Sequence, residues 1–172
     1  LAALDRLFQR RHRSEHAPAP QPFGGVVLVV DGDVQQVAGV AREGRGGMMT
    51  VPADIPAATP EEFDAVLAAH QPGPSFTISP AHDDLGSNAV ICSPPDSVPL
   101  RFGDNSYFPH LDAARLQGIE PTVIRQPGIA MDIDHPVDLA LFLRLPQSAG
   151  TRTRALLEEL GVPELLTKRG IA

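Results

Sequence analysis

Several features that many proteins rely on are scarce or absent in this sequence. The single cysteine, Cys92, cannot form an internal disulfide, and because it lies in an apolar run we expect a small core residue rather than a nucleophile. No apolar stretch approaches the roughly 18 residues of a transmembrane helix, and no signal peptide is visible at the N-terminus. We therefore expect a cytoplasmic protein without a membrane partner.

Positive charge is scarce as well. Lysine and arginine together number 14 against 21 aspartates and glutamates, which gives a formal net charge of −7. This balance argues against a nucleic-acid partner, and a polyanionic substrate would need metal ions or backbone N–H groups to neutralise it. The single cysteine has no histidine or second cysteine at zinc spacing, and the sequence has no Walker loop, no G-x-G-x-x-G and no G-x-S-x-G, so the corresponding sites are not expected.

What is present is an alternation of short apolar runs and helical patterns. A chain of 172 residues, 42 % of them hydrophobic, can form one domain with a real core. Short apolar runs predict strands at 25–30, 48–51, 75–79, 89–92, 122–125 and 129–133. Helices are expected over 1–16, 34–42, 107–117 and 151–160, after Thr59 and from Pro136, with a frayed end after residue 160. This order predicts an α/β fold, a mostly parallel sheet with helices on both faces in a Rossmann-type three-layer sandwich.

The helix after Thr59 has the clearest local signals. Thr59 can serve as N-cap, Pro60 occupies the first helical position, and Glu62 completes a T-x-x-E capping box. An apolar stripe at helical spacing follows, formed by Phe63, Val66 and Leu67. One face of this helix is therefore expected to pack on the sheet.

Three aspartates lie at the ends of predicted strands, where ligands bind in open α/β sheets. Asp54 follows the run 48–51, and Asp132 and Asp134 close the run 129–133. Residues i and i+2 of a strand point to one face, roughly 6–7 Å apart, and magnesium is held by carboxylates together with substrate phosphates. The sequence therefore offers a metal site, with two structural alternatives: Asp54 as a turn residue, and Asp134 as the cap of the helix at Pro136.

A second group of residues has the character of an anion site. The segment Gly86-Ser87-Asn88 lies in a loop between strands, and Gly103 and Ser106 lie just before a helix. Backbone N–H groups at a helix N-terminus, with glycine allowing close approach and serine adding hydroxyl donors, favour phosphate binding. The alternative is that Ser106 is only an N-cap. His110, in the first turns of that helix, could face a ligand or the solvent.

Four motifs in order resemble the 2-phospho-L-lactate guanylyltransferases. They are VPADIP (51–56), DDLGSNAVICSPP (83–95), FGDNSYFPHLDAA (102–114) and PGIAMDIDHPVDL (127–139), and together they span a little over half of the chain. The resemblance implies a nucleotidyltransferase fold related to the GT-A transferases. It also implies an enzyme that transfers GMP from GTP to the phosphate of 2-phospholactate, phosphoenolpyruvate or phosphoglycerate, in the biosynthesis of deazaflavin coenzyme F-420.

The resemblance also implies roles for individual residues. Two magnesium ions would be bound by three carboxylates, those of Asp54, Asp132 and Asp134. The phospho-acid would be held by Ser87, which stands where the family usually has threonine, and by Gly103 and Ser106, with Asn88 beside them. The family's nucleotide-binding loop has no counterpart before Val26, and the stretch between Val30 and Met48 is shorter than in the family.

Three functional readings follow from the sequence. The first is the magnesium-dependent guanylyltransferase just described, with GTP and a small phospho-acid as partners. The second keeps the fold with another acceptor, a molybdopterin or a sugar phosphate, and the third is a non-catalytic nucleotide-binding module. The oligomeric state stays open between a monomer and a homodimer.

Overall fold

The computed structural model describes residues 26–30, 40, 43–103 and 105–171 of the chain. Of the two helices expected over 1–16 and 34–42, only Val40 is described, and it is helical and buried. The strands are β1 (Val26–Val30), β2 (Gly47–Val51), β3 (Ser75–Pro80), β4 (Ser87–Ser93) and β5 (Thr122–Val123). The helices are α3 (Pro60–Ala69), α4 (Tyr107–Leu116), α5 (Pro136–Arg144), the 3-10 turn η2 (Pro146–Ser148), α6 (Arg152–Glu159) and α7 (Val162–Lys168).

The strands form one five-stranded sheet in the order β1-β2-β4-β3-β5. β1 pairs parallel with β2 and β3 parallel with β5, whereas β4 lies antiparallel between β2 and β3. The predicted parallel direction is therefore confirmed for every strand of this sheet except β4. β4 is reversed because only the short loop 81–86 joins it to β3, whereas a parallel partner needs a long crossover connection.

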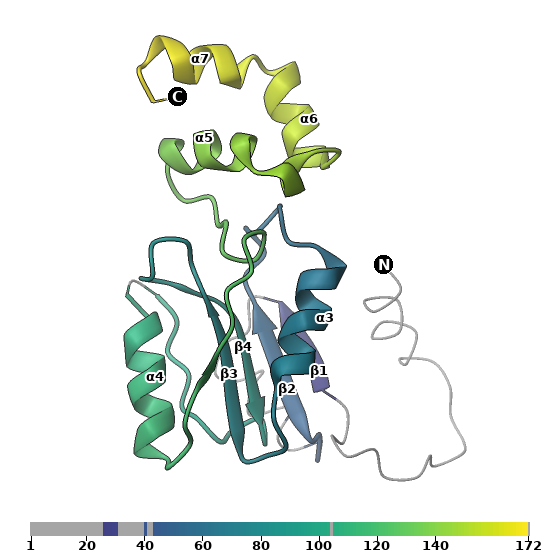
Figure 1. The fold of residues 1–172 in the computed structure, drawn as a ribbon, viewed down its shortest axis with the longest axis vertical. Helices are drawn as coiled ribbons and strands as arrows, with labels where there is room; N and C mark the ends of the chain where they lie inside the picture. The colour runs from purple at the N-terminus through teal and green to yellow at the C-terminus, as the bar shows by residue number, and fades with distance from the viewer. Residues whose placement is uncertain (1–25, 31–39, 41–42, 104, 172) are drawn as a thin grey trace, which may run out of the picture.

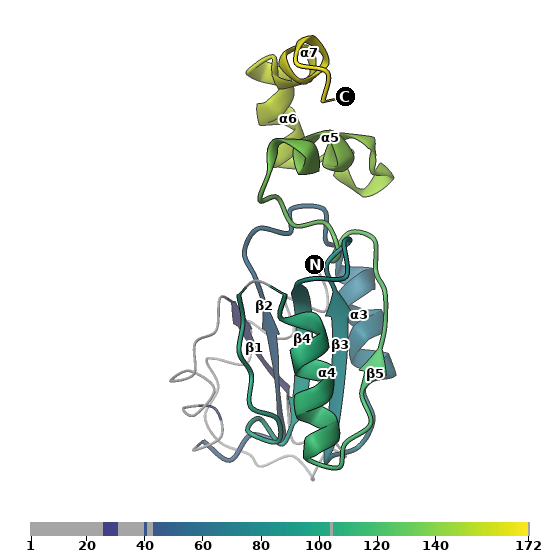
Figure 2. The ribbon, with the colours of Figure 1, turned by 90° about the vertical axis from the view of Figure 1, so that its left-hand side faces the viewer.

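Helices cover both faces of the sheet, as predicted (Figures 1 and 2). On one face, alternate residues of β4 such as Ala89 and Ile91 pack with Val66 of α3. On the other face, Val90 and Cys92 pack with α4. Cys92 is fully buried, which confirms the prediction of a core residue, and this burial raises the pKa of its thiol to about 12.

The predicted capping box opens α3 and also reaches further. The Glu62 N–H donates to Thr59 Oγ1 at 3.3 Å, and the Thr59 N–H donates to Glu62 Oε2 at 3.2 Å. The other carboxylate oxygen of Glu62 accepts from the Gly128 N–H at 2.7 Å. A Cβ atom on Gly128 would lie 2.3 Å from the Ala57 carbonyl oxygen, so only glycine fits there. Glu62 thus joins α3 to the turn at 127–130.

Two predictions for the C-terminal third are wrong. Residues 129–133 are not a strand, because 127–130 form a turn and 131–134 form no sheet ladder. Ile129 and Met131 are apolar because they are buried in two different clusters, not because they belong to a strand. The chain after residue 160 is not frayed, since Gly161, with φ +67°, ends α6 and α7 follows. β5 is also shorter than the predicted 122–125.

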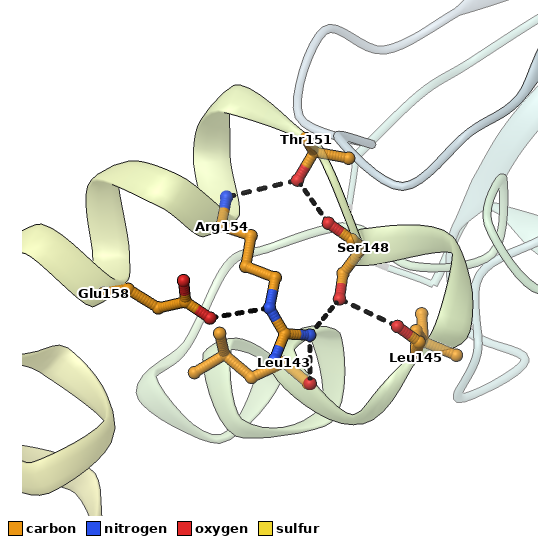
Figure 3. A network of polar contacts seen from close by, with 6 residues as sticks. All are labelled: Leu143, Leu145, Ser148, Thr151, Arg154 and Glu158. Carbon is orange, nitrogen blue, oxygen red and sulfur yellow. Dashed lines mark hydrogen bonds and ion pairs between the residues drawn. The ribbon is translucent and has the colours of Figure 1, made fainter.

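The helices α5, α6 and α7 lie beyond the edge of the sheet at which β2 and β3 end (Figure 1). Phe142 of α5 packs with Met131 and Ala57, which attaches this helical part to the sheet. Arg154 of α6 donates from Nη1 to the Leu143 carbonyl and to Ser148 Oγ, both at 2.9 Å (Figure 3). None of the helices in the described part of the chain is long and apolar enough to cross a bilayer.

Candidate active site

The predicted acidic residues come together where β2 ends. The Asp54 carbonyl accepts a hydrogen bond from the Ile133 N–H at 3.2 Å, so the Asp54 backbone lies beside the residue between Asp132 and Asp134. Asp54 and Asp134 are exposed, and Asp132 is half-buried. The fold therefore brings together two acidic segments that are almost 80 positions apart in the sequence.

The three carboxylates do not form a preassembled metal cage. Within the described residues, no group of three or more histidine, cysteine, aspartate or glutamate side chains is arranged to hold a metal ion. Asp134 is not the helix cap, because His135 is the N-cap residue of α5. Instead, Asp138 Oδ2 accepts from the backbone N–H groups of Asp134 and His135, at 3.1 and 2.7 Å. Magnesium binding by these aspartates stays a prediction.

His82, in the loop after β3, contacts the acidic segment on two sides. Its Nδ1 lies 3.6 Å from Asp132 Oδ1, and its Nε2 lies 3.7 Å from Asp138 Oδ1. Its backbone N–H donates to the Ala130 carbonyl at 2.9 Å. No motif in the sequence assigns a role to His82. Its position directly after an apolar strand, in the loop 81–86 that borders the site, was the only local signal.

Asn88 and Gly86 also lie close to the acidic segment. The Asn88 side-chain amide donates to the Ile129 carbonyl at 3.0 Å and is buried, so it anchors the turn that leads to Asp132. A Cβ atom on Gly86 would lie 3.7 Å from Asn88 Oδ1 and 4.0 Å from Asp132 Oδ2. The loop 81–86 therefore passes close to the acidic segment. The structure gives Asn88 a positioning role, and substrate binding by it stays a prediction.

The predicted anion-binding serines are in contact. The Ser106 hydroxyl donates to Ser87 Oγ at 3.1 Å, and Ser87 Oγ lies 2.9 Å from His110 Nδ1. Ser106 stands at the N-cap position of α4, but its side chain makes no cap hydrogen bond. Ser106 is therefore the N-cap residue by position, but its hydroxyl is used in the contact with Ser87, and anion binding by the two serines stays a prediction. Gly103, with φ +124° in a backbone region that favours glycine, is exposed in the loop leading into α4.

The side chain of His110 is buried, so it faces neither the solvent nor a ligand directly. Its side chain is 1 % exposed, and the ring of Phe102 meets it edge-on at 5.1 Å between centroids. The Arg101 N–H donates to His110 Nε2 at 3.0 Å. Burial lowers the pKa of His110 to about 4, so the imidazole is neutral near pH 7. Because Nε2 accepts a hydrogen bond, the single ring proton is assigned to Nδ1.

An exposed cation, Arg125, lies beside the loop 81–86. Arg125, which follows β5, forms an ion pair with Asp84 of the loop 81–86. This hydrogen bond with Asp84 raises the pKa of the Arg125 guanidinium. The pair connects the loop that carries His82 to the chain leading into the 127–130 turn.

A comparison with known families places the chain. The model of the family described as CofC-like guanylyl transferase matches residues 29–168. The chain belongs to this family. Its motifs at 51–56, 83–95, 102–114 and 127–139 all fall within the matched region.

The chain also matches individual curated proteins over part of their length. The chain is 38 % identical over 112 residues to the phosphoenolpyruvate guanylyltransferase of Rubrobacter xylanophilus, covering 65 % of this chain and 53 % of that protein. It is 38 % identical over 97 residues to the 3-phospho-D-glycerate guanylyltransferase of Colwellia psychrerythraea, covering 56 % of this chain and 46 % of that protein. The chain thus spans about half the length of the curated relatives it matches.

A solved structure supports the fold. A protein of Desulfovibrio desulfuricans assigned as a nucleotide-diphospho-sugar transferase superposes with a TM-score of 0.58 at 19 % identity. The match covers 78 % of this chain and 72 % of the other. This likeness confirms the predicted α/β architecture with an open sheet.

Proposed function

We propose that this protein is a guanylyltransferase that transfers GMP from GTP to the phosphate of a small phospho-acid. Phosphoenolpyruvate, 3-phosphoglycerate and 2-phospholactate are the acceptors to test. The single observation that carries the proposal is the hydrogen bond from the Ile133 N–H to the Asp54 carbonyl, which joins the two acidic segments at one edge of the sheet. Coenzyme F-420 biosynthesis, a cytoplasmic location and a homodimer remain expectations.

The acidic segment fits a hard divalent cation in one respect. Asp132 Oδ1 is shielded from solvent and accepts no hydrogen bond from the described residues, and Nδ1 of His82 lies 3.6 Å from it. A shielded carboxylate oxygen without a donor is the kind of ligand that magnesium takes up. Asp54, Asp132 and Asp134 would hold the ion, which would neutralise phosphate charge as diphosphate leaves.

Beside the acidic segment, other residues of the chain perform two tasks in this proposal. The hydroxyl pair of Ser87 and Ser106 offers a donor to an oxygen of the acid. The turn at 127–130, held by Glu62 and Asn88, fixes where the segment carrying Asp132 begins. Phosphoryl-type transfer depends mainly on positioning and charge neutralisation, so these tasks suffice without a covalent intermediate.

The test is release of diphosphate from each nucleoside triphosphate, with each of the three phospho-acids and magnesium. Asp132→Asn keeps the shape of the side chain but removes its charge, and it should lower turnover at least about a hundredfold. Asp64→Asn, on an exposed position of α3, is the matched control and should retain wild-type turnover. Full turnover in Asp132→Asn would contradict the role of the acidic segment. A wild-type chain that binds GTP but transfers nothing would favour a binding module.

A further inference from the structure

The hydroxyl of Ser87 has an unusual set of neighbours for an anion-binding serine. Ser87, Ser106 and His110 are 6 %, 5 % and 1 % exposed, and they form one continuous polar chain between the start of β4 and α4. Among the residues that the structure describes, no carboxylate takes part in the hydrogen bonds of this chain. The backbone donor at one ring nitrogen of His110 therefore decides which nitrogen carries the proton.

The starting point is the outer nitrogen of the imidazole. Nε2 of His110 accepts the Arg101 N–H at 3.0 Å, so it carries a lone pair and no proton. The ring proton therefore lies on Nδ1, which faces Ser87 Oγ at 2.9 Å and donates to it. Ser106 donates to the same oxygen at 3.1 Å. Both lone pairs of the Ser87 oxygen are thus occupied.

The hydroxyl proton of Ser87 takes part in none of these hydrogen bonds. A serine hydroxyl has one donor and two acceptor sites, so with both lone pairs occupied it can only donate to a further neighbour. An oxyanion offers only acceptors and is the complementary partner, and a hydrogen bond to a charged acceptor is stronger than one to a neutral group. A ligand group that carries its own proton would find no acceptor on Ser87.

We propose that His110 is a positioning residue that makes Ser87 a dedicated hydrogen-bond donor to an oxyanion of the phospho-acid. The inference rests on the function proposed above. His110 does not touch the substrate, and it acts through the Ser87 oxygen. Without a proton on Nδ1, this nitrogen would be an acceptor, and the Ser87 hydroxyl could donate to it instead of to the substrate.

Two substitutions separate the two nitrogens. His110→Gln can place an amide oxygen where Nε2 accepts the Arg101 N–H, but it has no donor near Nδ1. His110→Asn can place an amide N–H near Nδ1, so that Ser87 still receives a hydrogen bond. A merely structural imidazole would make the two variants equally harmful, or the glutamine variant the milder one.

The measurements are KM and kcat of the full chain with phosphoenolpyruvate and with 3-phosphoglycerate at saturating GTP and magnesium. His110→Gln should raise KM for the acid about tenfold or more, the size expected for losing a hydrogen bond to a charged group, while KM for GTP stays unchanged. His110→Asn should restore most of the loss. Because His110 acts through Ser87, the double variant Ser87→Ala, His110→Gln should match Ser87→Ala alone.

The tautomer provides a readout that is independent of activity. Long-range ¹H–¹⁵N spectra of the imidazole should show His110 neutral with its proton on Nδ1. A proton on Nε2, or KM effects of Ser87→Ala and His110→Gln that simply add, would overturn the inference. A wild-type chain that binds neither phospho-acid by calorimetry, with the Nδ1 proton confirmed, would instead overturn the proposed function.

Discussion

The buried, neutral imidazole of His110 should make the protein sensitive to mild acid. In the folded state its pKa is lowered by burial from 6.5 to about 4, and unfolding returns it to the ordinary value. Between these values the unfolded chain binds a proton that the folded chain does not. The contribution of the neutral His110 to the free energy of unfolding is therefore complete above pH 6.5, and it is lost as the pH falls from 6.5 toward 4.

The magnitude follows from the difference in pKa. The full loss, reached below pH 4, is about 3 kcal/mol, and at pH 5 it is about 2 kcal/mol. Burial also lowers the pKa of His70, so its contribution has the same sign. For a domain with a stability of about 5–15 kcal/mol such a loss is a large fraction of the total.

The assay is equilibrium unfolding in urea at pH 7.5, 6 and 5, for the wild type and for His110→Gln. The variant cannot take up this proton, so its free energy of unfolding should fall less between pH 7.5 and 5, by about 2 kcal/mol. Carboxylates titrate in both proteins and cancel in the comparison. Equal pH dependence in the two proteins would show that the imidazole is not held neutral by the fold.

Two further predictions concern stability. Gly128→Ala forces a Cβ atom against the Ala57 carbonyl and should destabilise the protein by about 3 kcal/mol, measured by urea unfolding; a loss below about 1 kcal/mol would refute the close packing. Arg154→Met removes the hydrogen bond to the Leu143 carbonyl and should cost about 1–3 kcal/mol. Glu158 is the exposed ion-pair partner of Arg154, and Glu158→Gln should cost less than about 1 kcal/mol. Equal losses in the two variants would contradict the larger contribution of the Arg154–Leu143 hydrogen bond.

The elements that the sequence predicts well are those decided locally. The capping box at Thr59 and Glu62 lies within four positions, and its geometry is present in α3. The apolar runs of β3 and β4 are buried along their whole length, so their local sequence is enough to predict them as strands. The same holds for Pro136 as the opening residue of α5.

The parts that it misses depend on distant contacts. The run 129–133 has the composition of a short strand, but its shape is set by Glu62 and Asn88, at separations of 66 and 41 residues. His110 and His82 gain their roles from Ser87 and Asp132, which no local pattern connects to them. The candidate aspartates and serines follow from their places at the ends of predicted strands and before a predicted helix, where structural alternatives stay open, and the motif resemblance favours their binding roles.

The double use of Glu62 has a consequence for any attempt to redesign this protein. One carboxylate oxygen begins α3, and the other holds Gly128 at the turn that leads toward Asp132. A substitution meant only to adjust the stability of the helix would therefore also shift the point from which the acidic segment starts. Engineering of α3 and engineering of the acidic segment are not independent choices in this fold.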